Sequence, residues 1–163
     1  MKHLIFAITG LLAGGASAAA QDACTKRDAA DRCLRCEFKV GPVFNNGEAL
    51  EFVCPGMPTD HVAQAWFEGH GVVGETSGQY GVKVQLVMKM MARDATQGFW
   101  TEKPKPDGWD FKMRTAWDVI PQDGNVPVRL ANQCTREDTA PKPTSKPLHL
   151  SEGTRLTVIS EKK

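Results

Sequence analysis

The sequence predicts a mainly antiparallel β domain, a small barrel or sandwich with one or two short helices on its N-terminal side. Apolar and polar residues alternate over several segments, which is typical of half-buried strands. Asn-Gly and Asp-Gly pairs stand between such segments, as they do in hairpins. About seven strands with hairpin-sized connections follow from these two patterns.

The first twenty residues have the composition of a secretory signal peptide. A basic start precedes an apolar run over 4–12, and small residues follow it. The run is far shorter than the roughly 20 apolar residues that cross a bilayer, and we expect cleavage between Ala19 and Gln21. Residues 1–20 are therefore predicted to be a signal peptide, and 21–163 a single disulfide-stabilised, periplasmic or secreted domain.

The predicted mature chain is formally neutral. Removing 1–20 from the 163-residue chain also removes one lysine, which leaves 19 basic and 19 acidic residues. A neutral chain lacks the basic patch that nucleic-acid binding requires. We therefore expect no nucleic acid, no membrane span, and a partner that is itself an exported or envelope protein.

Five cysteines are candidates for disulfides: Cys24, Cys33, Cys36, Cys54 and Cys134. In an oxidising compartment they form at most two bridges within the chain and leave one thiol over. Spacing does not determine connectivity. Among the possible pairings we favour Cys54 with Cys134, and Cys24 with Cys33 or Cys36.

Cys33 and Cys36 form a CxxC motif, a spacing that redox enzymes and metal sites also use. A thioredoxin-like site has this motif at the end of a strand and the start of a helix. Here the order is reversed, because the polar, alanine-rich stretch 22–32 predicts a short helix and 36–40 predicts a strand. We interpret the motif as scaffold and expect no metal or cofactor, with thiol exchange and metal binding as the alternatives.

The segments after the CxxC motif predict a hairpin, a helix and a loop. Asn46-Gly47 separates 36–40 from the alternating stretch 50–54, which indicates a hairpin. Thr59 precedes apolar residues at helical spacing, and Gly69 is placed to end that helix. The glycine-rich stretch 69–81 contains GxGxxG without the strand before it and the helix within it that bind a dinucleotide, so we expect a flexible loop.

Two strands are predicted from strong alternation over 82–90 and 109–119. Asp123-Gly124 then predicts a hairpin that returns over 126–130, where a proline indicates an edge or an irregular strand.

The C-terminal third adds a connection and a last hairpin. Residues 135–147 are polar and proline-rich and predict a surface connection. Residues 148–158 predict a closing hairpin around a Ser-Glu-Gly turn.

The tryptophans divide into core and surface candidates. Trp109, Phe111 and Trp117 share one strand parity, which places them in the core. Exposed aromatic residues next to a rigid charged loop are typical partner anchors. The candidates for partner binding are Phe99, Trp100, Lys103, Lys105 and Asp107.

No catalytic motif such as G-x-S-x-G occurs, so we expect a protein without enzymatic activity. The predicted function is an exported protein-binding factor of the bacterial envelope, of the assembly, adaptor or inhibitor type. The alternative is a thiol redox or copper-handling protein that uses Cys33 and Cys36. The methionines of 88–91 suit Cu(I), but alternation places Met88 and Met90 in the core.

Overall fold

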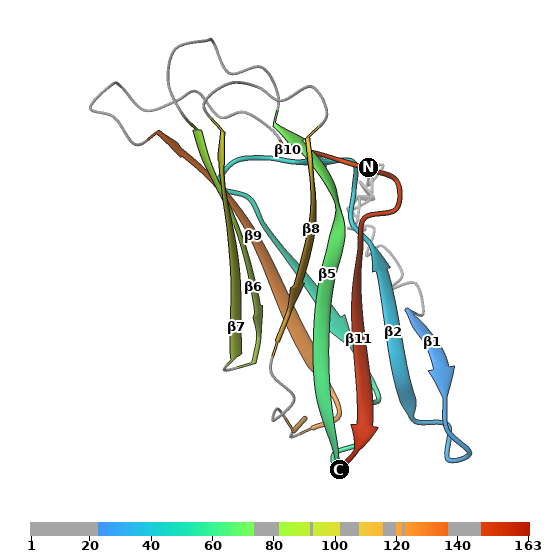
Figure 1. The fold of residues 1–163 in the computed structure, drawn as a ribbon. Coiled ribbons are helices and arrows are strands. Elements are labelled where there is room, and N and C mark those ends of the chain that lie inside the picture. Colours follow the sequence, from blue (N-terminus) through green and yellow to red (C-terminus); the bar gives the residue numbers. More distant parts are fainter. Residues whose placement is uncertain are drawn as a thin grey trace, which may run out of the picture.

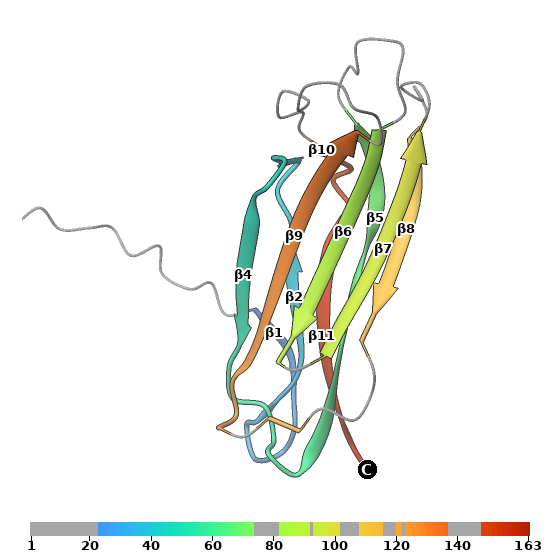
Figure 2. The same ribbon diagram turned by 90° about the vertical axis from the view of Figure 1, so that its left-hand side faces the viewer.

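The computed structural model describes residues 23–73, 82–91, 93–101, 108–115, 120, 121, 123–136 and 148–163. This part of the chain folds into strands and contains no helix. All strand pairs are antiparallel, and they form two sheets that face each other (Figures 1 and 2). The strands are β1 (Cys24–Arg27), β2 (Cys33–Lys39), β3 (Val43–Phe44), β4 (Ala49–Cys54), β5 (His61–Val73), β6 (Val82–Met90), β7 (Arg93–Thr101), β8 (Trp109–Arg114), β9 (Val126–Arg136), β10 (Leu148–Leu150) and β11 (Arg155–Lys162).

Sheet A consists of β1, β2, β3, β5, β8, β10 and β11, and sheet B has the order β4-β9-β6-β7. Figure 2 shows sheet B in front of sheet A. The core lies between them and takes side chains from both sheets. The predicted β class and antiparallel pairing are confirmed, whereas the described residues include neither the predicted helices nor a closed barrel.

The predicted helix after Thr59 is wrong, because that stretch forms the 13-residue strand β5. β5 pairs with β11 over 61–68 and with β8 over 66–71 on its other side, so it is the central strand of sheet A. Its outer face is partly covered as well, since Val62 and Gln64 are buried like the neighbouring core residues Ala63 and Ala65. Burial on both faces removes the alternation that marks a strand.

The glycines at the start of the predicted loop lie inside β5. Gly69 pairs with Phe111, and Gly71 pairs with both Trp109 and Leu150. A β-carbon on Gly71 would lie 3.0 Å from the Leu148 side chain, so the missing side chain makes room for a neighbouring strand. The expectation of a flexible loop is thus wrong for 69–73, and 74–81 lie outside the described residues.

The predicted helix over 22–32 is also wrong. β1 and β2 form a hairpin there, with Asp31 in the left-handed conformation at a φ of 63°. The Asp28 carboxylate accepts hydrogen bonds from the backbone N–H groups of Ala30 and Arg32, both at 2.9 Å. Hydrogen bonding by the Arg32 backbone is the main reason that the pKa of Asp28 lies below its usual value.

None of the three predicted hairpins exists. Asn46-Gly47 and Asp123-Gly124 do make turns, but each connects a strand of sheet A to a strand of sheet B. The predicted closing hairpin is instead two strands in line, because β10 and β11 are both antiparallel to β5. A local turn pattern predicts a change of direction and does not say which strand pairs with which.

The alternation in the predicted strands identifies the core correctly. The inward residues of β6 and β9 are buried, and Phe111 of β8 stacks on Phe67 with 4.9 Å between ring centroids. Trp109 is half-buried, and Trp117 lies outside the described residues. The buried residues of β6 and β9 are Val84, Leu86, Met88, Met90, Val126, Val128, Leu130 and Asn132.

The strand that contains Pro127 is central in sheet B, not at its edge. The pairing between β9 and β6 ends at Val128 and Met90, so Pro127 has only β4 beside it. A residue without an N–H is therefore tolerated at this position.

Candidate functional site: the cysteine cluster

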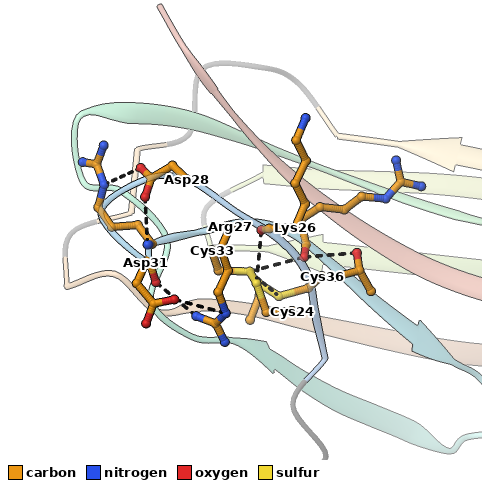
Figure 3. Close-up of a disulfide and its surroundings, with 11 residues drawn as sticks. Cys24, Lys26, Arg27, Asp28, Asp31, Cys33 and Cys36 are labelled. Carbon is orange, nitrogen blue, oxygen red and sulfur yellow. Dashed lines mark hydrogen bonds and ion pairs between the residues drawn. A yellow bond between two sulfur atoms is a disulfide. The ribbon is translucent and has the colours of Figure 1, made fainter.

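Four cysteines from three strands gather at one edge of the molecule. We call them the cysteine cluster: Cys24 of β1, Cys33 and Cys36 of β2, and Cys54 of β4. Cys24 is bonded to Cys33 with 5.8 Å between α-carbons, and Cys36 is bonded to Cys54 with 5.9 Å. The first disulfide links the two strands of the β1–β2 hairpin (Figure 3), whereas the second joins sheet A to sheet B.

An irregular strand register brings both cysteines of the CxxC motif to one side of β2. In a regular strand, residues three apart point to opposite faces. Between β1 and β2 the register shifts on either side of the Lys26–Arg35 pair, so that β2 has an extra residue between Arg35 and Cys33. Such a bulge reverses the alternation, and the sulfur atoms of Cys33 and Cys36 lie 3.6 Å apart.

The sulfur atoms form a compact group with one accessible member. Cys33 Sγ lies 4.0 Å from Cys54 Sγ, close to its distance from Cys36 Sγ. Cys33, Cys36 and Cys54 are fully buried, whereas Cys24 is half-buried. A reagent in solvent therefore reaches the cluster through Cys24.

Charged groups of the β1–β2 hairpin surround the accessible end. Lys26 and Arg27 lie two and three residues after Cys24 (Figure 3), and the Arg32 guanidinium lies 2.7 Å from Asp28. Hydrogen bonding to Asp28 is the main reason that the pKa of Arg32 is raised. The carbonyl oxygen of Lys26 lies 3.3 Å from Cys24 Sγ and would accept a hydrogen bond from that sulfur if it were reduced.

The predicted bridge between Cys54 and Cys134 is wrong. Cys54 pairs in the sheet with Val126, at the start of β9. Cys134 lies near the end of β9 and pairs there with Val84. Eight residues of extended strand separate 126 from 134, a distance of about 26 Å at roughly 3.3 Å per residue. Cys24 does bond to one of the CxxC cysteines, Cys33, but Cys36, which the predicted pairing would leave as the odd thiol, is bonded to Cys54.

The CxxC motif is not a dithiol pair of its own, because each cysteine is bonded to a cysteine outside the motif. It also lies within a strand, away from the helix N-terminus that activates a thioredoxin-like thiol. The sulfurs of Cys33, Cys36 and Cys54 all lie within 4.8 Å of one another. They would offer thiolate ligands to a soft metal only after reduction.

The methionines considered for copper, and the two histidines of β5, have structural contacts. Met88 and Met90 are buried in β6, as alternation predicts. His61 is buried, and its Nδ1 lies 3.1 Å from the Ser160 hydroxyl. His70 Nδ1 lies 2.8 Å from a carboxylate oxygen of Asp110 on the neighbouring strand.

The predicted partner-binding residues fall at the boundary of the described structure. Phe99 and Trp100 belong to β7, where their backbones pair with Val84 and Lys83. Their side chains lie outside the described part, as do Lys103, Lys105 and Asp107. Sequence reasoning did not predict that 93–101 would be a sheet edge, although the stretch ends in the β-favouring residues Phe99, Trp100 and Thr101.

The described residues include no helix that is long and apolar enough to cross a membrane. Sheet B carries a pocket of about 200 Å³ whose lining includes Val53, Lys89 and Pro127, which is below the roughly 300–1,000 Å³ of typical ligand sites. No protein-family model matches the chain, and no curated protein or solved structure is detectably similar to it.

Proposed function

We propose that the protein is an exported, non-enzymatic binding factor of the bacterial envelope that holds an extended segment of another exported protein along β7. The observation that carries the proposal is that this strand is long and regular and has one edge without a described pairing partner. β7 has nine residues, pairs in unbroken register with β6, and pairs with no other described strand. β8 of sheet A lies on the outer side of β7 without pairing to it (Figure 2), so no described strand uses the outer backbone donors and acceptors of β7, and an extended chain could pair with them.

The other four sheet edges carry features that oppose such pairing, and β3 is the shortest of them, with only two residues. β1 has only four residues and an irregular register. β8 has six residues and exposes Lys112 and Arg114. β4 ends in Cys54, which is bonded across to sheet A. Short length, bulges and charged side chains are the usual protection of edge strands.

β7 lacks these features. It contains neither lysine nor proline, its register has no shift, and its charged residues are confined to its start at Arg93 and Asp94. A long, regular and unprotected edge is the surface that accepts an added strand, with main-chain hydrogen bonds for affinity and side-chain pockets for specificity.

Two further observations support the proposal. The predicted aromatic anchors Phe99 and Trp100 are in the last part of β7, so a partner strand along this edge would reach them. The two disulfides suit an oxidising compartment, where the predicted signal peptide would deliver the chain.

Site-specific photo-crosslinking tests the proposal. Gly98 is exposed on β7, and a β-carbon added there would meet no atom within 4 Å, so a photoreactive residue fits. We expect a discrete adduct with an envelope protein in cells that carry the label at Gly98. The matched control is Gly41, which is equally exposed and open but lies after β2. No adduct from Gly98, or the same adduct from both positions, would refute binding at β7.

A charge substitution gives the complementary test. Lysine on an edge strand opposes pairing with a second chain. Thr96→Lys at an exposed position of β7 is expected to abolish the Gly98 adduct and leave the midpoint of thermal unfolding unchanged. Thr25→Lys on β1 is the control, and its adduct yield should match that of the parent protein.

A further inference from the structure

We propose that the two disulfides are coupled by exchange, and that a low-molecular-weight monothiol converts the pairing Cys24–Cys33 with Cys36–Cys54 into Cys24–Cys36 with Cys33–Cys54. This inference concerns the cysteine cluster alone and does not depend on binding at β7. It rests on the positions of four sulfur atoms and on the exposure of only one of the four cysteines.

The first step is set by exposure. A thiolate from solvent attacks a disulfide sulfur and expels the other sulfur as a thiolate. Only Cys24 is accessible, since Cys33, Cys36 and Cys54 are fully buried. Attack therefore forms a mixed disulfide on Cys24, breaks the Cys24–Cys33 bond, and leaves the electron pair on Cys33.

The second step is set by proximity. The released Cys33 sulfur lies 3.6 Å from Cys36 Sγ and 4.0 Å from Cys54 Sγ, beside the second disulfide. Exchange needs an approach along the axis of the bond, and Cys33, no longer tethered to Cys24, reaches that line by rotation about its χ1 angle. Attack on Cys54 forms Cys33–Cys54 and releases Cys36 as a thiolate.

Backbone geometry selects Cys54 over Cys36 as the target. Cys33 and Cys36 are three residues apart in one strand. Their α-carbons would be about 10 Å apart in fully extended backbone, and a bulge shortens this distance somewhat. Disulfides need α-carbons within roughly 4.4–6.8 Å. Cys33 already meets the chain beyond Cys54, because its backbone N–H donates to the Gly56 carbonyl at 2.8 Å.

The third step closes the cycle. Cys24 and Cys36 are direct partners in the β1–β2 register, and such partners have α-carbons about 4.5–5.5 Å apart. The Cys36 thiolate attacks the Cys24 sulfur of the mixed disulfide and expels the monothiol. Two disulfides enter the cycle and two leave it, the thiolate is regenerated, and nothing is oxidised or reduced overall.

The conversion would relocate the covalent link between the sheets. In the observed pairing β4 is tied to Cys36, in the middle of β2, whereas in the second pairing it is tied to Cys33 at the start of that strand. β1 remains bonded to β2 in both. The cluster is thus a thiol-responsive site that changes its connections without releasing either strand.

Peptide mapping tests the conversion directly. In a Cys134→Ala background, which removes the fifth thiol, the protein is held at pH 8 with glutathione at one tenth of its concentration. The sample is then quenched with acid, alkylated and digested without reduction. We expect peptides joined through Cys24–Cys36 and Cys33–Cys54 to appear beside the original pair. A map that retains only the original pair would overturn the proposal.

A single substitution tests the second step without any added thiol. Cys24→Ala in the same background leaves Cys33 as a permanent thiol beside the Cys36–Cys54 bond. The expected map contains both Cys36–Cys54 and Cys33–Cys54, with alkylation divided between Cys33 and Cys36. If only Cys33 is alkylated and only Cys36–Cys54 is found, the relay is refuted.

A matched double variant tests the role of Cys33. Cys24→Ala with Cys33→Ala leaves the buried bridge without its relay, and circular dichroism establishes that the variant is folded. With excess glutathione, Cys36 and Cys54 should become alkylatable at least tenfold more slowly than in the Cys134→Ala parent. Equal rates would show that glutathione reaches the buried bridge directly, which would refute entry through Cys24.

Discussion

Gly69 of β5 lies so close to Thr154 that a β-carbon on Gly69 would be 2.8 Å from the Thr154 β-carbon and 3.0 Å from its α-carbon. Thr154 is buried and stands immediately before β11, where the chain bulges between the two strands that run along β5. The backbone of Thr154 also accepts a hydrogen bond from the Val40 N–H at 3.2 Å. A glycine in β5 thus lets an interrupted neighbouring strand pack against it.

Gly69→Ala is expected to lower the free energy of unfolding by about 1–3 kcal/mol, because the added methyl group overpacks a site bounded by the side chain and α-carbon of Thr154. Urea denaturation measures the change. Gly98→Ala is the control, since a β-carbon there meets no atom within 4 Å, and it should change stability by less than about 1 kcal/mol. Equal losses in the two variants would contradict the assigned role of Gly69.

Phe111→Ala should cost about 3–5 kcal/mol, because the ring is buried and stacks on Phe67. The next residue provides the control. Lys112 is exposed, and its amine lies 3.5 Å from Glu68 in an ion pair that solvent screens. Lys112→Ala is expected to cost about 0.5 kcal/mol or less in the same urea experiment. A Phe111→Ala protein of unchanged stability would contradict the packing of β8 on the core.

Thiol labelling checks the disulfide assignment. Four of the five cysteines are bonded in pairs, so alkylation of denatured, non-reduced protein should modify Cys134 and no other cysteine. Acidic conditions during unfolding keep thiols protonated and prevent exchange. Intact mass should show one added group per chain, and peptide mapping should locate it. Labelling of any cluster cysteine would contradict the observed pairing.

Glu68→Gln should reduce the dependence of stability on pH. The Arg155 guanidinium donates two hydrogen bonds to Glu68 at 2.7 and 2.9 Å, and these hold the pKa of Glu68 below its usual value of 4.5. A lowered pKa in the folded state stabilises the protein above pH 4.5, and this contribution is lost as the pH falls through the folded-state value. Because the pair is exposed, we expect a contribution on the order of 1 kcal/mol or less.

Urea denaturation at pH 7 and pH 3 measures this effect. The parent should exceed the Glu68→Gln variant in stability at pH 7, and the difference should shrink as the pH falls below 4.5. Glu51→Gln is the control, because its carboxylate is largely exposed and lies 3.9 Å from Arg129. A difference for Glu68→Gln that is as large at pH 3 as at pH 7 would show that packing, not charge, is responsible.

Edman sequencing of exported protein checks the predicted leader. The apolar run and the small residues after it predict a mature N-terminus between Ala19 and Gln21. Recovery of protein that begins at Met1 from the periplasm or medium would contradict the predicted cleavage.

The sequence alone determined the features that depend on neighbouring residues. Alternation identified the inward faces of β6, β8 and β9, because side chains of a strand point in turn to opposite sides. Asn46-Gly47 and Asp123-Gly124 were correctly recognised as turns, and both glycines adopt positive φ values. Alternation and the five cysteines were likewise sufficient to predict a disulfide-bonded, mainly β domain.

Only the tertiary structure decided which strands are partners. The two hairpins among the described strands, β1–β2 and β6–β7, turn at Asp31 and Met91, which are not glycines. The glycine turns that looked like hairpins instead carry the chain between sheets. β5 was mistaken for a helix because neighbours on both sides and cover on both faces remove its alternation.

The disulfide pairing likewise depends on which strands are partners. Whether Cys54 meets Cys36 or Cys134 depends on which end of β9 lies beside β4, and pairing with Val126 places Cys54 at the end remote from Cys134. The bulge that turns Cys33 toward Cys36 is likewise a property of the β1–β2 register. Sequence patterns predict the face of a strand to which each side chain points. Which distant strands pair depends on how their apolar faces pack into one core, and a local pattern does not contain this information.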